Sequence, residues 1–234
     1  MKIALLGYGT MGQAVERAAL ARGHEIVLKK SSANTYDGLE NADVAIDFST
    51  PASAVVNITT ALNTAIPVIS GTTGWLDDYE IIVKQCQQMG GAFLHASNFS
   101  LGVNLFFELN AHLAALMAGF PEYRIRMQEI HHTKKLDAPS GTAITLAKGI
   151  IDKSDYSSWA LKSTRPDEIP IESVRRDDVP GTHSIYYESA VDSIEITHTA
   201  FNREGFALGA VIAAEWIRGK SGVFSMKDVL GLQG

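Results

Sequence analysis

The sequence predicts an α/β protein whose N-terminal domain contains a parallel sheet and whose second domain is of mixed α+β type. Up to about Asn98, short apolar runs alternate with longer helical stretches, which is typical of parallel βαβ units. A G-x-G-x-x-G motif stands between the first apolar run and the first helical stretch. After Asn98, strand-like alternating runs appear, which indicates antiparallel pairing. We therefore expect a first domain of residues 1–99 plus 205–234 and a second domain of residues 100–204.

The first domain is expected to begin with a strand at Lys2–Leu6 and a helix at Thr10–Arg22, which Gly23 ends. A second strand is expected at Glu25–Leu28. Pro51 suits the first turn of another helix. Three more strands and a polar helix are predicted at Asp43–Phe48, Pro67–Ser70, Gly91–His95 and Glu80–Gln88.

The second domain is expected to begin with a long apolar helix from about Leu101 to Met117. An alternating strand at Tyr123–Ile130 and a helix after Ser140 follow. The segment Lys153–Pro170 is rich in Ser, Asp and Pro, which predicts a surface excursion. The last predicted elements are two antiparallel strands and a helix that returns to the first domain, at His183–Glu188, Ser193–Thr199 and Gly205–Arg218.

The composition narrows the class of protein. With 234 residues, 46% of them hydrophobic, and a formal net charge of −6, the chain can build a sizeable core. It lacks the surplus of Lys and Arg that nucleic acid or an anionic membrane would require. Cys86 is the only cysteine, which excludes an intrachain disulfide. We find no signal-peptide pattern and no run of ~18 apolar residues, so we expect a cytoplasmic protein.

The G-x-G-x-x-G motif predicts a dinucleotide site of the Rossmann type because it directly follows a strand and opens a helix. Gly7 permits the tight turn, Gly9 lets the backbone approach a pyrophosphate, and Gly12 lets the helix pack close to the strand. The phosphates would lie at the helix N-terminus. The alternative is a tight turn in a protein that binds no nucleotide. The predicted cofactor-binding residues of this motif are Gly7, Tyr8, Gly9, Thr10, Met11 and Gly12.

The end of the second strand bears on the choice of nicotinamide cofactor. No carboxylate is available there for the adenine ribose of NADH, whereas Lys29 and Lys30 could receive the 2′-phosphate of NADPH. We therefore expect NADPH, or use of both NADPH and NADH; the alternative is a solvated pair of lysines. Two loops at later strand ends complete the predicted cofactor site with Gly71, Thr72, Thr73, Ala96, Ser97, Asn98 and Phe99.

The most unusual segment is Glu129–Ala143, which reads EIHHTKKLDAPSGTA. It follows a strand that carries Arg124 and Arg126, so positive charge gathers within an acidic protein and suits a carboxylate substrate. Histidine is the usual proton donor near neutral pH. The alternatives are a solvated polar turn and a metal site. We expect no metal, because adjacent histidines on a strand point to opposite faces and no Cys, His or Asp spacing nearby completes a site.

The same segment resembles the signature of the 4-hydroxy-tetrahydrodipicolinate reductases, also called dihydrodipicolinate reductases, E-[IL]-H-H-x-x-K-x-D-A-P-S-G-T-A. Further blocks agree in order over nearly the whole chain: Gly7–Gly12, Ser70–Gly74, Asn98–Asn104, Gly209–Trp216 and Gly222–Leu230. The resemblance implies a Rossmann domain completed by the C-terminal helix and an inserted α+β domain whose open sheet builds a homotetramer. It also implies reduction of 4-hydroxy-tetrahydrodipicolinate to tetrahydrodipicolinate with NAD(P)H and loss of water, in lysine and diaminopimelate biosynthesis.

The resemblance further implies roles for individual positions. His131 is similar to the family's general acid, and Lys135 to its second proton-handling residue. The implied substrate-binding residues are His132, Ser140, Gly141 and Thr142. By contrast, we interpret Asp137 as loop structure and His198 as an ordinary strand residue.

Two features depart from the family pattern. The connection between the second strand and Asp43 is short, which predicts an open adenine-side pocket, and lysines replace the usual acidic and basic pair. Competing interpretations are an aspartate or diaminopimelate dehydrogenase, a non-catalytic NADP(H) sensor, and a reductase of a neighbouring substrate. The first does not account for His-His-x-x-Lys beside Ser-Gly-Thr, and the second predicts a degraded chemical site.

Overall fold

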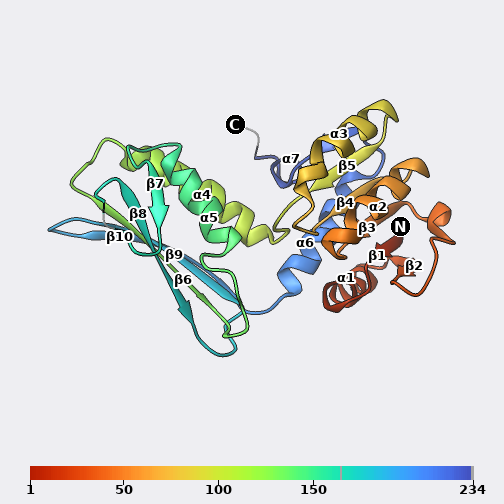
Figure 1. Cartoon of the computed structure of the whole chain (residues 1–234), viewed down its shortest axis with the longest axis horizontal. Coiled ribbons are helices and arrows are strands. Elements are labelled where there is room, and N and C mark those ends of the chain that lie inside the picture. The colour runs from red at the N-terminus through yellow and green to blue at the C-terminus, as the bar shows by residue number, and fades with distance from the viewer. Residues whose placement is uncertain (164, 233–234) are drawn as a thin grey trace. The chain divides into compact units, whose positions relative to one another are not determined.

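The structure is a computed structural model that describes residues 1–163 and 165–232. The chain divides into two compact units: Met1–Leu101 together with the chain from Glu204 onward, and Gly102–Arg203 (Figure 1). Thr164, in the predicted surface excursion, lies outside the described residues, as do Gln233 and Gly234 at the end of the predicted first domain.

The first unit is built on a six-stranded sheet with the strand order β11-β5-β4-β3-β1-β2, in which every pair of neighbours is parallel. The strands are β1 (Lys2–Leu6), β2 (Glu25–Lys30), β3 (Val44–Asp47), β4 (Val68–Ser70), β5 (Ala92–His95) and β11 (Gly222–Phe224). The order reverses between β1 and β3, and such a switch point is where open parallel sheets bind ligands. The predicted fold class is confirmed.

Helices cover both faces of this sheet, which explains why its strands are apolar on both sides. The described helices and 3-10 turns of the unit are α1 (Thr10–Ala21), α2 (Pro51–Asn63), α3 (Tyr79–Gln88), α6 (Glu204–Ile217), α7 (Met226–Leu230), η1 (Leu39–Asn41) and η2 (Leu76–Asp78). One core layer joins α1 and α6 to Ile3 and Leu5 of β1, and the other joins α2 and α3 to Ala4 and Leu6. Alternate residues of one strand therefore face opposite layers.

The second unit is a five-stranded mixed sheet with the order β10-β9-β6-β8-β7. Its elements are α4 (Leu101–Met117, whose first residue belongs to the first unit), β6 (Arg124–His131), α5 (Gly141–Ile151), β7 (Ser158–Ala160), β8 (Glu168–Arg175), β9 (Gly181–Glu188) and β10 (Ser193–Ala200). The central strand β6 runs antiparallel to β9 and parallel to β8. Every second residue of β6 is buried, namely Ile125, Met127, Glu129 and His131, and the apolar members pack with α4 and α5. The face of the sheet under the helices thus becomes polar toward the end of β6.

The predicted surface excursion at Lys153–Pro170 is wrong. Ser158–Ala160 forms the edge strand β7, and β8 begins at Glu168 within the predicted excursion. Trp159 pairs with Ile169, which is fully buried. Most of the polar residues of this segment lie before β7 and between β7 and β8, so the composition gave no sign of the short parallel ladder. None of the described helices is long and apolar enough to span a membrane.

Helix α6 lies in the interior of the first unit and depends on a close approach at Gly209. A Cβ added there would lie 1.7 Å from the carbonyl oxygen of Phe99 and 2.8 Å from its carbonyl carbon. Gly205 begins the same helix, and a Cβ there would meet only the Ser100 hydroxyl at 3.7 Å.

We predict that Gly209→Ala lowers the free energy of unfolding by about 2 kcal/mol or more, because backbone atoms must move to admit the methyl group. Gly205→Ala is the matched control and should be neutral or slightly stabilising, since alanine favours helix. Urea denaturation of both variants measures the difference. Equal stabilities for the two variants would contradict the close approach.

Candidate active site

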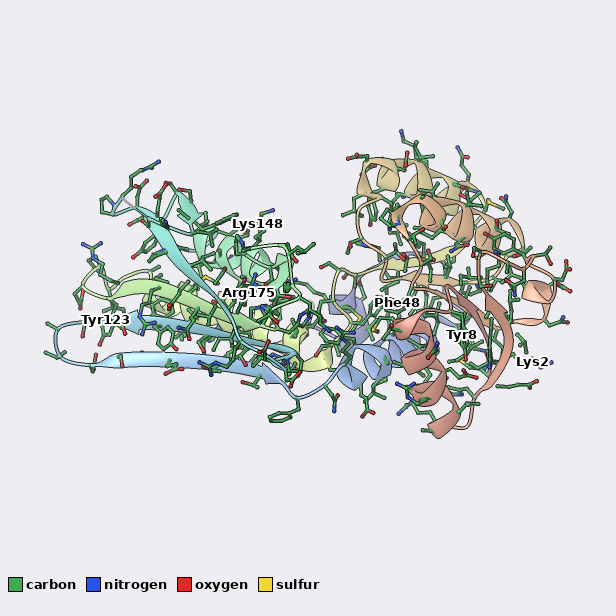
Figure 2. All side chains as sticks on the ribbon, turned by 60° about the horizontal axis from the view of Figure 1, so that its bottom comes forward. Lys2, Tyr8, Phe48, Tyr123, Lys148 and Arg175 are labelled. Carbon is green, nitrogen blue, oxygen red and sulfur yellow. The ribbon has the colours of Figure 1, made fainter. Side chains whose placement is uncertain are left out.

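A cavity of about 550 Å³ opens at the switch point of the parallel sheet. Its lining comes from the loop after β1, the end of β2 and the segment after β3. Among the lining residues are Gly7, Tyr8, Gly9, Lys30, Tyr36 and Phe48, and Figure 2 labels Tyr8 and Phe48. A hollow of this size at the N-terminus of α1 suits an extended anionic ligand.

The glycine motif packs as its sequence predicts. Gly7 has a φ of +111°, and a Cβ there would lie 2.2 Å from the carbonyl oxygen of Phe48. At Gly12 a Cβ would lie 2.2 Å from the carbonyl oxygen of Gly7. Gly9 is the N-cap of α1, and no described atom lies within 4 Å of a Cβ added there. The residue expected to face a pyrophosphate therefore borders open space.

The two lysines at the end of β2 have different surroundings. Lys29 Nζ lies 2.5 Å from Glu16 Oε1 and 5.1 Å from the centre of the Tyr8 ring. The hydrogen bond from Lys29 lowers the pKa of Glu16, and Tyr8 donates a second hydrogen bond to the same carboxylate. Lys30 lies over the Tyr36 ring at 5.1 Å and lines the cavity, whereas Lys29 does not. Of the two lysines, Lys30 is therefore the one that lines the cavity.

A buried carboxylate, Asp47, organises the loops after β3 and β4. Its two oxygens accept hydrogen bonds from Ser49, Asn57, Ser70 and Thr72 at 2.7 to 2.8 Å. Burial raises the pKa of Asp47, and these donors oppose the rise. The hydrogen bonds from Ser70 and Thr72 fix the end of β4 and the loop after it to Asp47.

The other predicted loop residues lie at the ends of neighbouring strands, outside the cavity itself. Thr72 is buried and accepts the Ser49 N–H at 2.8 Å, while Thr73 is exposed. A Cβ at Gly71 would overlap the Phe48 ring at 2.1 Å, and Phe48 meets Phe99 edge to face at 5.8 Å. The remaining members of the prediction, Ala96, Ser97 and Asn98, follow β5, which pairs with β4.

In the second unit, Glu129 is the centre of a polar cluster at the end of β6, with no exposed surface. Its Oε2 accepts the Ser140 N–H at 2.9 Å, and its Oε1 accepts the Ser173 hydroxyl at 2.9 Å and Arg175 Nη1 at 3.4 Å. Burial raises the pKa of Glu129, but the bonds from Ser140 and Ser173 and the nearby His131 outweigh it and lower the pKa overall. The carboxylate therefore stays charged at neutral pH.

His131, the last residue of β6, lies beside this carboxylate. Its Nδ1 is buried, has no hydrogen-bond partner among the described residues, and lies 3.6 Å from Glu129 Oε2. Burial lowers the pKa of His131, Lys135 and Arg175 lower it further, and Glu129 and Asp137 oppose the fall. The ring can therefore give up a proton readily, and the adjacent carboxylate becomes an ion-pair partner when the ring is protonated.

The loop between β6 and α5 is held by a residue that the sequence analysis missed. Arg175 (Figure 2) donates to the carbonyl oxygens of Lys135 at 3.2 Å and Asp137 at 2.6 Å. Lys135 Nζ contacts both oxygens of Asp137 at 2.8 Å. Asp137 is thus an ion-pair partner as well as a loop residue. Lone arginines at strand ends carry no sequence signal, which explains the omission.

Helix α5 begins at Gly141, among the substrate-binding residues that the family resemblance implies. Ser140 is its N-cap, and the Ser140 hydroxyl accepts the Ala143 N–H at 3.2 Å. A Cβ at Gly141 would have none of the described atoms within 4 Å, so the first turn has open space beside it. His132 and Thr142 are partly buried, at either end of the connecting segment. The N-terminus of a helix favours a carboxylate, because its backbone N–H groups and its dipole attract negative charge.

His183 of β9 joins the cluster from across the sheet and was also missed. Its Nε2 lies 3.1 Å from the Ser140 hydroxyl and 3.8 Å from Glu129 Oε2. Its ring meets the His131 ring edge to face, with centres 5.0 Å apart. Burial and the neighbouring His131 lower the pKa of His183 to about 3, so it is neutral near pH 7. Only the strand register brings it here, because His183 lies opposite Glu129.

The trio Glu129, His131 and His183 also has the spacing of a metal site, with one ligand atom from each within 4.8 Å of the others. The expectation of no metal rests on positions near His131 in the sequence, and His183 lies far from them along the chain. Both oxygens of Glu129 already accept hydrogen bonds from neighbouring residues. We therefore interpret the trio as a packed polar cluster in which Glu129 receives its hydrogen bonds from neighbouring residues.

Comparison with known proteins identifies two matching family models. Residues 1–99 match the N-terminal model of dihydrodipicolinate reductase, and residues 102–230 match its C-terminal model. A 4-hydroxy-tetrahydrodipicolinate reductase of Christiangramia forsetii is 55% identical over 98% of this chain and 98% of its own. One of Akkermansia muciniphila is 38% identical over 96% of this chain and 95% of its own. The family resemblance predicted from the sequence is confirmed.

A solved structure shares the fold. It is the dipicolinate-bound dihydrodipicolinate reductase from Paenisporosarcina sp. TG-14, with a TM-score of 0.74 and 22% sequence identity. The match covers 96% of this chain and 97% of that one. It supports the architecture of sheets and helices described above.

The low pKa of His183 predicts an acid-dependent loss of stability. In the unfolded chain His183 binds a proton below its ordinary pKa of 6.5, whereas in the folded protein it does so only near 3. Stability is therefore present above about pH 6.5 and falls as the pH decreases toward 3, by up to about 1.4 kcal/mol per pH unit.

We expect His183→Phe to remove the pH-dependent contribution of His183 to stability. The free energy of unfolding of the variant should therefore depend less steeply on pH than that of the wild type. Denaturant titrations at several pH values between about 5 and 7 measure both slopes. Parallel curves for the two proteins would show that His183 is not held neutral.

Proposed function

The chain belongs to the dihydrodipicolinate reductase family, and from this premise we propose roles for its site residues. It is an oxidoreductase that reduces 4-hydroxy-tetrahydrodipicolinate to tetrahydrodipicolinate in lysine and diaminopimelate biosynthesis. Enzymes of this family use NAD(P)H. The reaction consumes one hydride and one proton and releases water, so the protein must supply a proton donor and hold a dicarboxylate.

We propose that His131 is the general acid. The observation that carries this role is its position, buried beside the charged carboxylate of Glu129 at 3.6 Å. A lowered pKa makes the ring a ready donor, and Glu129 stabilises the protonated form that must be present before transfer. Lys135, fixed by Asp137, is the second proton-handling residue and adds positive charge beside the substrate.

The substrate's carboxylates would bind at the start of α5. The N–H groups of Gly141 and Thr142 and the Thr142 hydroxyl would hold one carboxylate, where the helix dipole favours negative charge. The open space beside Gly141 leaves room for the ligand. Ser140 contributes indirectly, because its own hydroxyl caps the helix, and His132 would contact the ring of the substrate from the end of β6.

The cofactor fits the first unit. When bound, NAD(P)H supplies the hydride. Gly7–Gly12 would hold its pyrophosphate at the start of α1, where Gly9 borders open space. The loops with Gly71–Thr73 and Ala96–Phe99 would contact its nicotinamide half, since they follow the next two strands of the sheet. Lys30 and Tyr36 would surround the adenosine, because both line the cavity.

Oligomer and location are also proposals. We propose a homotetramer built on the face of the mixed sheet opposite α4 and α5. On that face Arg126 stacks on Tyr186 at 3.6 Å and pairs with Glu188 at 2.9 Å. We propose a cytoplasmic location, where NAD(P)H is available and the lone thiol of Cys86 stays reduced.

The reaction is tested by following NAD(P)H oxidation at 340 nm, with the substrate generated in situ from pyruvate and aspartate semialdehyde by the preceding synthase. The wild type should oxidise the cofactor only when substrate is present. His131→Gln should lower kcat by about 100-fold or more, because it removes the proton donor. It should bind the cofactor as the wild type does; an unchanged kcat would refute the general-acid role.

The lysine pair gives a test of cofactor choice. Lys30→Ala should raise the KM for NADPH about tenfold and leave that for NADH nearly unchanged, because a ligand charge pair worth about 1.4 kcal/mol is lost. Lys29→Ala is the matched control, since Lys29 is paired with Glu16 and does not line the cavity. The outcome that contradicts this assignment is a larger NADPH effect from Lys29→Ala.

A further inference from the structure

Four polar residues form a row across the mixed sheet. Glu129 of β6 lies opposite Ser173 of β8 on one side and His183 of β9 on the other, and His183 lies opposite His198 of β10. All four side chains are on the face that packs with α4 and α5, because alternate residues share a face. The two central members, Glu129 and His183, are also the two that contact the start of α5.

Each central member makes one contact to the proton donor and one to the helix N-terminus. Glu129 lies 3.6 Å from His131 Nδ1 and accepts the Ser140 N–H at 2.9 Å. The His183 ring packs against His131, and its Nε2 lies 3.1 Å from the Ser140 hydroxyl. His131 and Ser140 are therefore connected twice, through two different side chains.

A purely structural role would be served better by apolar side chains. The neighbouring positions on the same face are apolar: Met127, two residues before Glu129 on β6, and Ile185, two residues after His183 on β9, lie directly opposite each other and are buried. Burying a carboxylate and an imidazole costs several kcal/mol unless their hydrogen bonds are made, and apolar replacement of such groups is often neutral or stabilising. The change from an apolar pair to a carboxylate–imidazole pair occurs at the end of the strand that carries His131.

We propose that Glu129 and His183 are positioning residues that hold His131 and the N-terminus of α5 as one unit. The separation between the proton donor and the carboxylate site is then fixed before substrate binds, which saves ordering at the moment of reaction. This inference rests on the proposed function of His131 and of the Ser140–Thr142 turn.

Glu129 and His183 act on His131 in different ways, one through its charge and the other through its position. Around His131, Lys135 of the loop and Arg175 of β8 disfavour the protonated ring, Glu129 and Asp137 favour it, and His183 is neutral. Glu129 is the nearest and most buried of the favourable groups. It therefore sets the proton affinity of His131, whereas His183 acts through contact and hydrogen bonding.

The first test is Glu129→Gln, which keeps the shape and an oxygen for the Ser140 N–H but removes the charge. We expect kcat to fall at least tenfold with KM for the substrate changed less than twofold. The alkaline limb of kcat/KM should move to lower pH by about one unit, because an opposite charge within 4 to 6 Å has been lost. A merely structural residue would leave that limb in place.

The second test separates the two contacts of His183. His183→Phe keeps a ring against His131 but loses the bond to Ser140, and should weaken binding of the substrate and of pyridine-2,6-dicarboxylate about tenfold with little change in kcat. His183→Gln keeps a polar group near Ser140 and should restore that affinity while lowering kcat. His198→Phe, which keeps the aromatic contact with Phe106, is the matched control and should leave kcat, KM and the pH profile unchanged.

The inference is overturned if Glu129→Gln and His183→Phe lower only the melting temperature and leave kcat, KM and the alkaline limb as in the wild type. If Glu129→Gln does not fold, a double-mutant cycle of His183→Phe with Ser140→Ala decides the matter. The two losses in dicarboxylate affinity should be non-additive, and additive losses would contradict the connection. Failure of the proposed function is distinguishable, because the wild type would then show no substrate-dependent oxidation.

Discussion

The second unit depends on one buried charge. Glu129 has no exposed surface, and a carboxylate in such a place is tolerated only when donors surround it. Those donors come from the start of α5 and from Ser173 and Arg175 of β8, so the charge joins two separate segments to the end of β6. Arg175 in turn holds the backbone of the loop that carries Lys135. The loop and helix thus take their places around a carboxylate.

The first unit also contains a buried carboxylate that is surrounded by donors from several segments. Asp47 ends β3, is buried, and is surrounded by donors from the segment after β3, from α2 and from the end of β4 and its following loop. Both carboxylates lie where a strand meets a loop that is expected to bind an anion. A buried carboxylate there fixes the loop backbone without facing the ligand. An exposed carboxylate would repel an anionic ligand. Rigid loops lower the ordering cost of binding.

Much of the fold could be predicted because the relevant signals are local. The strand Lys2–Leu6 has the predicted bounds, and the helix Leu101–Met117 agrees with the approximate prediction, since an apolar run or a helical period is complete within each. The strand β7 could not be predicted, because three residues show no period and their polar neighbours dominate the composition.

The candidate site was predicted only where it is continuous in the sequence. The segment from His131 to Thr142 has its own signature, whereas Arg175 and His183 are single residues more than 30 positions away, joined to Glu129 by strand register. The pairing of Lys29 with Glu16 likewise depends on how a helix packs beside a strand. Such contacts follow from the assembled sheet and leave no local pattern.

The claim that Glu129 sets the proton affinity of His131 is tested most directly by a nitrogen-15 NMR titration of the His131 ring, in the wild type and in Glu129→Gln. The account predicts a lower midpoint for His131 in the variant, because the charge that favours its protonated form has been removed. It also predicts that His183 stays neutral in the wild type down to about pH 3. An unchanged His131 midpoint would mean that Glu129 does not govern the proton donor, and the central claim would be wrong.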